Sequence, residues 1–152
     1  NFLNESDLFI EIKNYINSNG KFLGICLGFQ ILFQRSDEGS LSGLSFIKSD
    51  IEKINKNKNV LIPHVGFNEV NFQEKTIFHE LNNNSFYFTH SYGFINNNVS
   101  STLNHGYTNY GPLKFISFVQ NKNVIACQFH PEKSSKAGVK FLNLLELWLK
   151  ND

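Results

Sequence analysis

The stretch Lys21-Phe-Leu-Gly-Ile-Cys-Leu-Gly-Phe-Gln30 joins an apolar run to a cysteine and then to a second apolar segment. Residues 22–25 are typical of a short buried strand, and the apolar spacing over residues 27–35 predicts a helix. Cys26 would then lie at the turn between the two elements. A cysteine at a helix N-terminus is favoured as a thiolate by the helix dipole, so the stretch predicts a nucleophile.

The two glycines of this stretch, Gly24 and Gly28, flank Cys26 at two residues on either side. Residues without a Cβ are needed where a strained strand-to-helix elbow brings backbone segments together. In such an elbow the backbone N–H of Leu27 can donate to an oxyanion. A buried core cysteine is the alternative interpretation, because cysteine also packs as a small hydrophobic residue.

The composition excludes several function classes. The chain has 152 residues and a net charge of +1, which predicts one domain over 1–152 and no nucleic-acid partner. No apolar run approaches the ~20 residues of a membrane span, and the first residues do not resemble a signal peptide. With only Cys26 and Cys127 available, a disulfide framework is not expected and the cytoplasm is the expected location.

The order of predicted elements indicates an α/β fold with a mostly parallel sheet and an antiparallel portion. Helices are predicted over 6–19, 27–35 and 136–150, with a helical turn over 76–81. Strands are predicted over 21–26, 44–54, 85–92, 99–107, 114–120 and 124–129, with a hairpin turn at 121–123.

A base for Cys26 is expected among the five histidines, and His130 is the candidate. It follows the predicted strand 124–129 and has a carboxylate, Glu132, two residues on. In extended backbone, residues i and i+2 point the same way, so Glu132 can accept from one imidazole nitrogen and leave the other for the thiol. Cys26, His130 and Glu132 would then act as nucleophile, base and orienting group. Without the elbow, His-Pro-Glu would be interpreted as a surface turn.

Four motifs together resemble a known family. Gly24-Ile-Cys-Leu-Gly-Phe-Gln30 and Gln128-Phe-His-Pro-Glu-Lys133 resemble the class I (triad) glutamine amidotransferases. Ile62-Pro-His-Val-Gly-Phe-Asn68 and Tyr87-Phe-Thr-His-Ser-Tyr92 are similar to the glutaminase subunit of imidazole glycerol phosphate synthase. The resemblance implies a three-layer, flavodoxin-like α/β fold and no cofactor or metal.

The resemblance also implies roles for individual residues. Cys26 would attack the side-chain amide of glutamine, His130 would pass its proton to the leaving ammonia, and the Leu27 N–H would be one oxyanion donor. Binding of L-glutamine is implied for Gly28, Gln30, Glu38, His90, Ser91 and Tyr92. A solvent-facing helix residue is the alternative for Gln30.

A partner is implied as well, because this family delivers ammonia to a (β/α)₈-barrel cyclase subunit in a heterodimer that serves histidine biosynthesis. The irregular apolar loop 62–68 suits an interface. The implied docking residues are Pro63, His64, Phe67, Asn68 and Lys133. An ordinary surface lysine is the alternative for Lys133.

Other functions stay open at this point. The same chemistry could supply a cyclase-like paralogue in surface-sugar modification, and no residue separates the two pathways. A catalytically inactive scaffold subunit is disfavoured because all three members of the triad are present. A cysteine hydrolase of the same fold is disfavoured by Gln30 and Glu38.

The sequence departs from the family in two places. The family's first strand and its Pro-Gly-x-Gly loop, which supplies a second oxyanion donor, have no counterpart here, so we expect this chain alone to be weakly active or inactive. Phe67 stands where the family usually has tryptophan, which removes an indole N–H from the expected interface.

Overall fold

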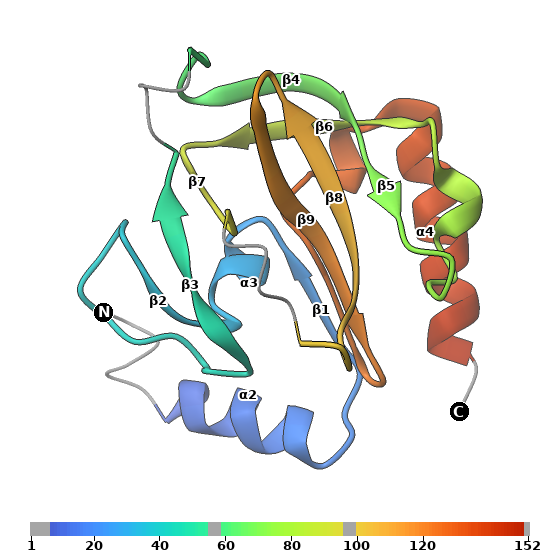
Figure 1. Ribbon diagram of the computed structural model, residues 1–152. Helices are drawn as coiled ribbons and strands as arrows, with labels where there is room; N and C mark the ends of the chain where they lie inside the picture. Colours follow the sequence, from blue (N-terminus) through green and yellow to red (C-terminus); the bar gives the residue numbers. More distant parts are fainter. Residues whose placement is uncertain (1–6, 55–58, 96–99, 151–152) are drawn as a thin grey trace.

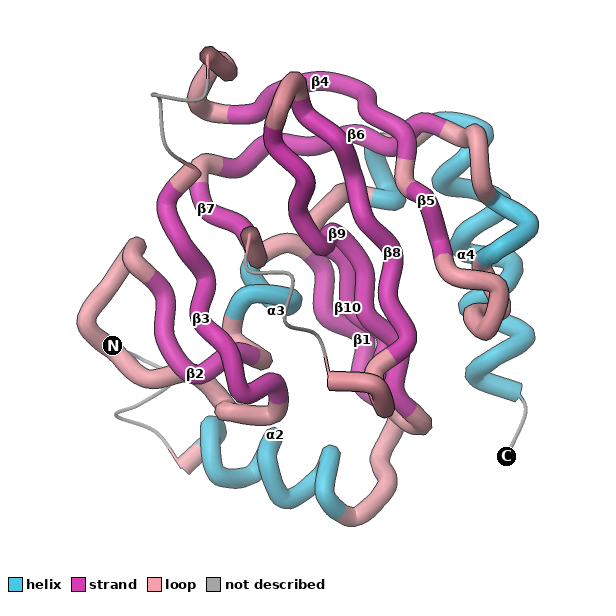
Figure 2. Tube along the Cα trace, viewed as in Figure 1, coloured by secondary structure: helices cyan, strands magenta, loops and turns pink. Residues whose placement is uncertain are grey.

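The computed structural model describes residues 7–54, 59–95 and 100–150, whose strands form three sheets (Figures 1 and 2). The largest has the order β1 (Phe22–Ile25), β10 (Val124–Cys127), β9 (Leu113–Asn121), β8 (Asn104–Tyr110) and β5 (Asn71–Phe72). The second contains β2 (Phe33–Ser36), β3 (Ile47–Lys53) and β7 (Tyr92–Gly93), and the third pairs β4 (His64–Glu69) with β6 (Ser85–His90). The helices are α2 (Leu8–Asn17), α3 (Leu27–Gln30) and α4 (Ser135–Lys150), with 3₁₀ turns η2 (His79–Leu81) and η3 (Pro131–Lys133).

Two hydrophobic cores lie on opposite faces of the large sheet. Along β10, Ile125 and Cys127 belong to one core, whereas Val124 and Ala126 belong to the other, as the two-residue period of a strand requires. The first core is covered by α4, and the second includes buried side chains of α2 and α3 (Figure 1). The expected three-layer α/β arrangement is therefore confirmed, and Cys127 is a core residue.

The sheets are mixed, and their parallel share is smaller than the sequence predicts. Among the described strands, β1 pairs with β10 and β2 with β3 in parallel, and the remaining pairs are antiparallel. The cause is short connections. β8, β9 and β10 follow one another through tight turns, which allow only antiparallel pairing, whereas a parallel pair needs a longer crossover.

The helix predicted over 27–35 differs from the structure. It ends at Gln30, and residues 33–36 form β2, in which Phe33 pairs with Ile47 of β3. Phe33 is fully buried in the second core. A short apolar run fits a buried helix or a buried strand equally well, and here the pairing with β3 decides between them.

The irregular loop predicted over 62–68 is wrong from residue 64 on, where the chain forms β4 and pairs with β6. The other predicted elements are present with shifted ends. The predicted helix 136–150 is α4, and the predicted helix 6–19 contains α2, although its first residue lies outside the described residues. The predicted strand 99–107 begins only at Asn104 in β8, and its first residue also lies outside the described residues. The turn at 121–123 joins β9 to β10 as expected.

No helix in the described ranges is long and apolar enough to cross a bilayer.

The two glycines of the elbow differ in what surrounds them, and this gives a stability prediction. A Cβ at Gly24 would lie 2.4 Å from the backbone oxygen of Gly28, whereas a Cβ at Gly28 would meet no atom within 4 Å. We expect Gly24→Ala to lower the free energy of unfolding by about 1–3 kcal/mol. The new Cβ would clash with the backbone of Gly28, which cannot move aside as a flexible side chain could. Gly28→Ala, the matched control, should leave the free energy of unfolding unchanged or slightly raised, since alanine favours helix. Urea unfolding of both variants measures this, and equal stabilities would contradict the elbow geometry.

Candidate active site

The candidate nucleophile and the candidate base follow adjacent parallel strands. Ile25 at the end of β1 is in register with Cys127 at the end of β10, and the Cys26 N–H donates to the Cys127 carbonyl at 2.8 Å. Cys26 and the segment 128–132 therefore leave the sheet at the same edge. The carboxyl ends of parallel strands are where α/β proteins place their ligands.

Cys26 has the backbone of a strained elbow, with φ at +51°. Its Sγ accepts a hydrogen bond from Gln128 Nε2 at 3.6 Å. Burial raises the pKa of the Cys26 thiol, and the negative charges of Glu132 and Glu38 add to this, while hydrogen bonds from Leu27 and Gln128 oppose it.

The helix N-terminus therefore favours a thiolate at Cys26 less than the sequence suggested, because burial raises the pKa of the thiol. The helix after Cys26 has only four residues, and the cost of burying a charge outweighs the effect of its N-terminus. The thiol must lose its proton to a base before it can act as a nucleophile.

His130 and Glu132 are in contact as predicted, but through a different backbone. His130 Nδ1 and Glu132 Oε1 are 2.7 Å apart. Residues 131–133 form the 3₁₀ turn η3, with His130 as its N-cap, rather than extended chain. Pro131 occupies the first position of the turn, where its missing N–H costs nothing. The prediction of the contact is confirmed, and the prediction of an extended segment is wrong.

The second imidazole nitrogen of His130, Nε2, is not used by Glu132. An ionised carboxylate can only accept a hydrogen bond, so Nδ1 of His130 is protonated and donates to Glu132. Nε2 of the neutral ring therefore presents a lone pair. That Nε2 is buried and has no hydrogen-bond partner in the described part of the chain. The backbone around it is fixed, because the His130 N–H donates to the Tyr87 carbonyl at 2.8 Å and the His130 carbonyl accepts from Ser134 Oγ.

A pocket of about 410 Å³ opens beside Cys26. It brings together eight of the residues singled out in the sequence and adds Thr89, which the sequence did not point to. The lining is Cys26, Leu27, Gln30, Glu38, Pro63, Thr89, His90, Ser91 and Tyr92. Of the residues implied for glutamine binding, only Gly28 is not part of this lining.

Gln30 is 8% exposed and makes two hydrogen bonds with its amide nitrogen, so it is not a solvent-facing residue. Nε2 donates to the Tyr92 carbonyl at 3.2 Å and to Gln128 Oε1 at 3.0 Å. The Tyr92 carbonyl also accepts from His90, and the Ser91 carbonyl accepts from the Ile54 N–H. The backbone carbonyls of Ser91 and Tyr92, two residues implied for glutamine binding, thus accept hydrogen bonds from within the protein.

A pair of buried histidines connects this pocket to the surface. His64 and His90 are opposite one another in the β4–β6 pairing, with His64 Nδ1 and His90 Nε2 2.9 Å apart. His90 Nδ1 lies 2.7 Å from the Tyr92 carbonyl, and Asn68 Nδ2 lies 2.9 Å from His64 Nε2. Burial lowers the pKa of each imidazole to about 4, so both are neutral at pH 7.

Four of the five residues expected at a docking face are at least partly exposed, and the fifth, His64, is buried. Phe67 is 56% exposed and packs edge-to-face on Tyr87, over whose ring the exposed Lys133 ammonium also lies. Pro63 is exposed, and Asn68 is partly exposed. His64, however, is only 1% exposed and stacks on Tyr110, so it cannot touch a docked protein directly.

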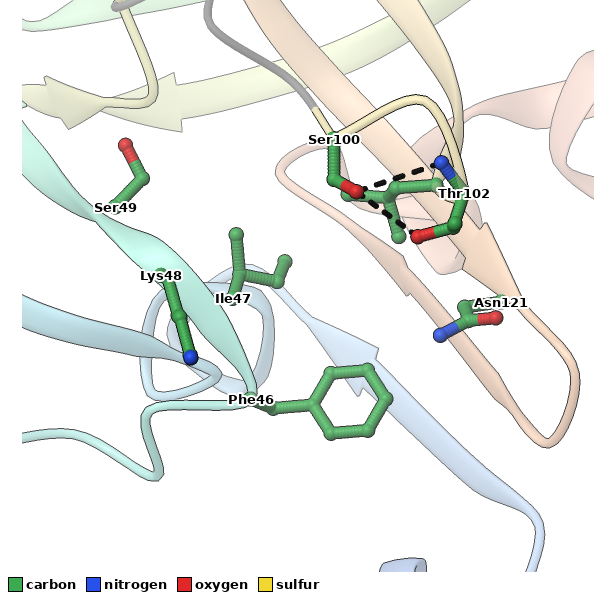
Figure 3. A pocket seen from close by; sticks show the side chains of 8 residues that line it. Phe46, Ile47, Lys48, Ser49, Ser100, Thr102 and Asn121 are labelled. Carbon is green, nitrogen blue, oxygen red and sulfur yellow. Dashed lines mark hydrogen bonds between the residues drawn. The ribbon is translucent and has the colours of Figure 1, made fainter.

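A second pocket, of about 500 Å³, lies between β3 and the segment that leads into β8 (Figure 3). Two of the three hydroxyl groups among its described lining residues, those of Ser100 and Thr102, are hydrogen-bonded to each other. Among the described residues that line it, Lys48 is the one ionisable residue and none is a cysteine or a histidine. The larger volume therefore does not make it the better candidate for catalysis.

Comparison with known proteins shows the family of the chain. The family model described as "Glutamine amidotransferase class-I" matches residues 4–145. The chain is 46% identical over 148 residues to the imidazole glycerol phosphate synthase subunit HisH of Prochlorococcus marinus strain MIT 9312, covering 96% of this chain and 70% of that protein. It is 44% identical over 154 residues to the same subunit of P. marinus strain CCMP1986, covering 99% and 72%.

Solved structures show the same fold. One described as a crystal structure of glutamine amidotransferase superposes with a TM-score of 0.66 at 15% identity, over 96% of this chain and 70% of that one.

Proposed function

The chain belongs to the class I glutamine amidotransferases and, within them, to the HisH subunits of imidazole glycerol phosphate synthase, and we propose that it hydrolyses L-glutamine at Cys26 for histidine biosynthesis. The observation that carries the assignment of the site is the lone pair of His130 Nε2. Within residues 7–54, 59–95 and 100–150 this atom is buried without a hydrogen-bond partner, while Nδ1 is fixed by Glu132, at the sheet edge where Cys26 also lies. A buried acceptor without a donor is costly, and a thiol that approaches it would remove the cost.

The reaction we propose starts with proton transfer. The Cys26 Sγ–H proton passes to His130 Nε2, and the sulfur attacks the amide carbon of glutamine. The Leu27 N–H, whose residue lines the pocket, donates to the oxyanion. The imidazolium, stabilised by Glu132, returns the proton to the leaving nitrogen, which departs as ammonia.

Hydrolysis then regenerates the enzyme. Water gives a proton to His130 Nε2 and attacks the glutamyl thioester. The Cys26 sulfur leaves and takes that proton back, and glutamate is released. Atoms and charges balance without any further reactant.

Glutamine recognition is assigned to the pocket side chains. Gln30 uses its amide nitrogen inside the protein, which leaves its carbonyl oxygen for the substrate ammonium. Glu38 brings a carboxylate to the same pocket and suits that ammonium as well.

The partner we propose is a (β/α)₈-barrel cyclase subunit that receives the ammonia. Support comes from the exposed apolar side chains of Leu61, Val65 and Phe67, which lie on and before strand β4, together with the exposed Lys133 after His130. Such a patch next to a catalytic residue is typical of an interface. The free thiols of Cys26 and Cys127 support the cytoplasm as the location.

The test uses the natural polypeptide that carries these residues, together with the cyclase subunit of the same source. Imidazole glycerol phosphate formation is measured with glutamine or with an ammonium salt as the nitrogen source. We expect glutamine to support the reaction at a lower concentration than ammonium does. A complex that works with ammonium and not with glutamine would refute the glutaminase assignment. Failure to form a complex would refute the partner.

A further inference from the structure

Gln128, the residue before Phe129, contacts two residues that line the pocket, Gln30 and Cys26. It is fully buried just beyond the end of β10. Its backbone N–H donates to the Ser117 carbonyl at 2.9 Å, at the place where β9 has an extra residue relative to β8. The main chain at Gln128 is therefore fixed, and among the described residues its side chain hydrogen-bonds to Gln30 and Cys26 alone.

The orientation of the Gln128 amide follows from the backbone carbonyl of Tyr92, which can only accept hydrogen bonds. The Tyr92 carbonyl receives Gln30 Nε2, so the nitrogen of Gln30 is the atom that faces Gln128. Gln128 must then present Oε1 to Gln30 at 3.0 Å, which turns its Nε2 toward Cys26 Sγ at 3.6 Å. One backbone group thus sets the direction of both amides.

The same carbonyl fixes the two histidines. His90 must donate from Nδ1 to the Tyr92 carbonyl, so its Nε2 accepts from His64 Nδ1, and His64 Nε2 accepts from Asn68. In this series of hydrogen bonds, from Asn68 through the two histidines to Tyr92, each donor faces one acceptor and both imidazoles are neutral. The Tyr92 carbonyl is therefore a fixed point from which Gln30 and then Gln128 are aligned.

We propose that Gln128 is a positioning residue for glutamine hydrolysis, holding the Cys26 sulfur with its amide nitrogen and the Gln30 amide with its oxygen. The inference rests on the proposed function, since it takes Cys26 as the nucleophile. Gln128 exchanges no proton. Its N–H stabilises the sulfur after the proton has moved to His130, and its oxygen keeps the Gln30 carbonyl directed to the substrate.

The test is Gln128→Met, which keeps the size of the side chain and removes both hydrogen bonds without adding charge. The rate of Cys26 alkylation by iodoacetamide is followed against pH by peptide mapping. We expect the midpoint to rise by about one pH unit and kcat for glutamine to fall by about 10–100-fold, with a smaller change in KM, because a donor to a developing negative charge is lost. The other titratable groups near the sulfur are unchanged in the variant: Glu38, His90, Cys127, His130 and Glu132.

The matched control is Gln120→Met on the neighbouring strand β9, because Gln120 Oε1 is buried without a hydrogen-bond partner in the described part of the chain. This variant should move neither the alkylation midpoint nor kcat. Gln128→Leu repeats the test if the methionine variant folds poorly. An unmoved midpoint in folded Gln128 variants would overturn the inference while the wild-type enzyme still hydrolyses glutamine. A wild-type enzyme that does not hydrolyse glutamine would instead overturn the proposed function.

Discussion

Replacing Cys26 by alanine is expected to lower glutamine-dependent product formation by at least about 10³-fold, because no other group in the pocket can form the thioester. Ammonium-dependent formation by the same complex should stay at the wild-type level, since free ammonia needs no glutaminase. Parallel assays with the two nitrogen sources measure the effect.

The matched control is Cys127→Ala, the same change one strand away. Cys127 is fully buried in the core, and burial raises the pKa of its thiol well above the usual value. The folded variant should keep its glutamine-dependent rate within about twofold, because its backbone bond to Cys26 is retained. Loss of activity in Cys127→Ala with retention in Cys26→Ala would reverse the assignment of the nucleophile.

Mild acid should destabilise the protein through the buried histidine pair. Folding lowers the pKa of His64 and of His90 from 6.5 to about 4, so each imidazole binds a proton more readily in the unfolded chain. Their contribution to stability is fully present above pH 6.5 and is lost as the pH falls from 6.5 toward 4. Between pH 7.5 and pH 5 we expect the free energy of unfolding to fall by about 3–4 kcal/mol, as linkage requires for two such groups.

Urea unfolding at a series of pH values measures this slope. His64→Gln removes one of the two titrations and should reduce the slope by about half, whereas His79→Gln, at an exposed position, should leave it unchanged. A stability that does not change between pH 7.5 and pH 5 would show that the two imidazoles are not buried in the neutral form. The nearby His130 is present in every variant of this series.

The elbow and the His–Glu contact could be predicted because their signals are local. Gly24, Cys26 and the start of α3 lie within one short stretch, and His130 and Glu132 are two residues apart. The length of the helix after Cys26 could not be predicted, since Phe33 becomes part of a strand only through pairing with β3.

The hydrogen-bond network behind the pocket could not be predicted from the sequence either. His64 and His90 meet because β4 and β6 pair in one particular register, and a shift by one residue would direct these side chains to the other face. The role of Gln128 could not be predicted, because its contacts, Gln30 and Cys26, lie about a hundred residues away in the chain. Its position directly before the predicted catalytic segment was the one available signal.

The most direct test of the triad is chemical labelling of the natural polypeptide with a glutamine analogue that carries a diazoketone or chloroketone in place of the amide. We predict one adduct per chain, located on Cys26 by peptide mass mapping, formed more slowly in the presence of glutamine and lost in His130→Asn. An adduct on Cys127, or labelling of Cys26 that glutamine does not slow, would contradict the account.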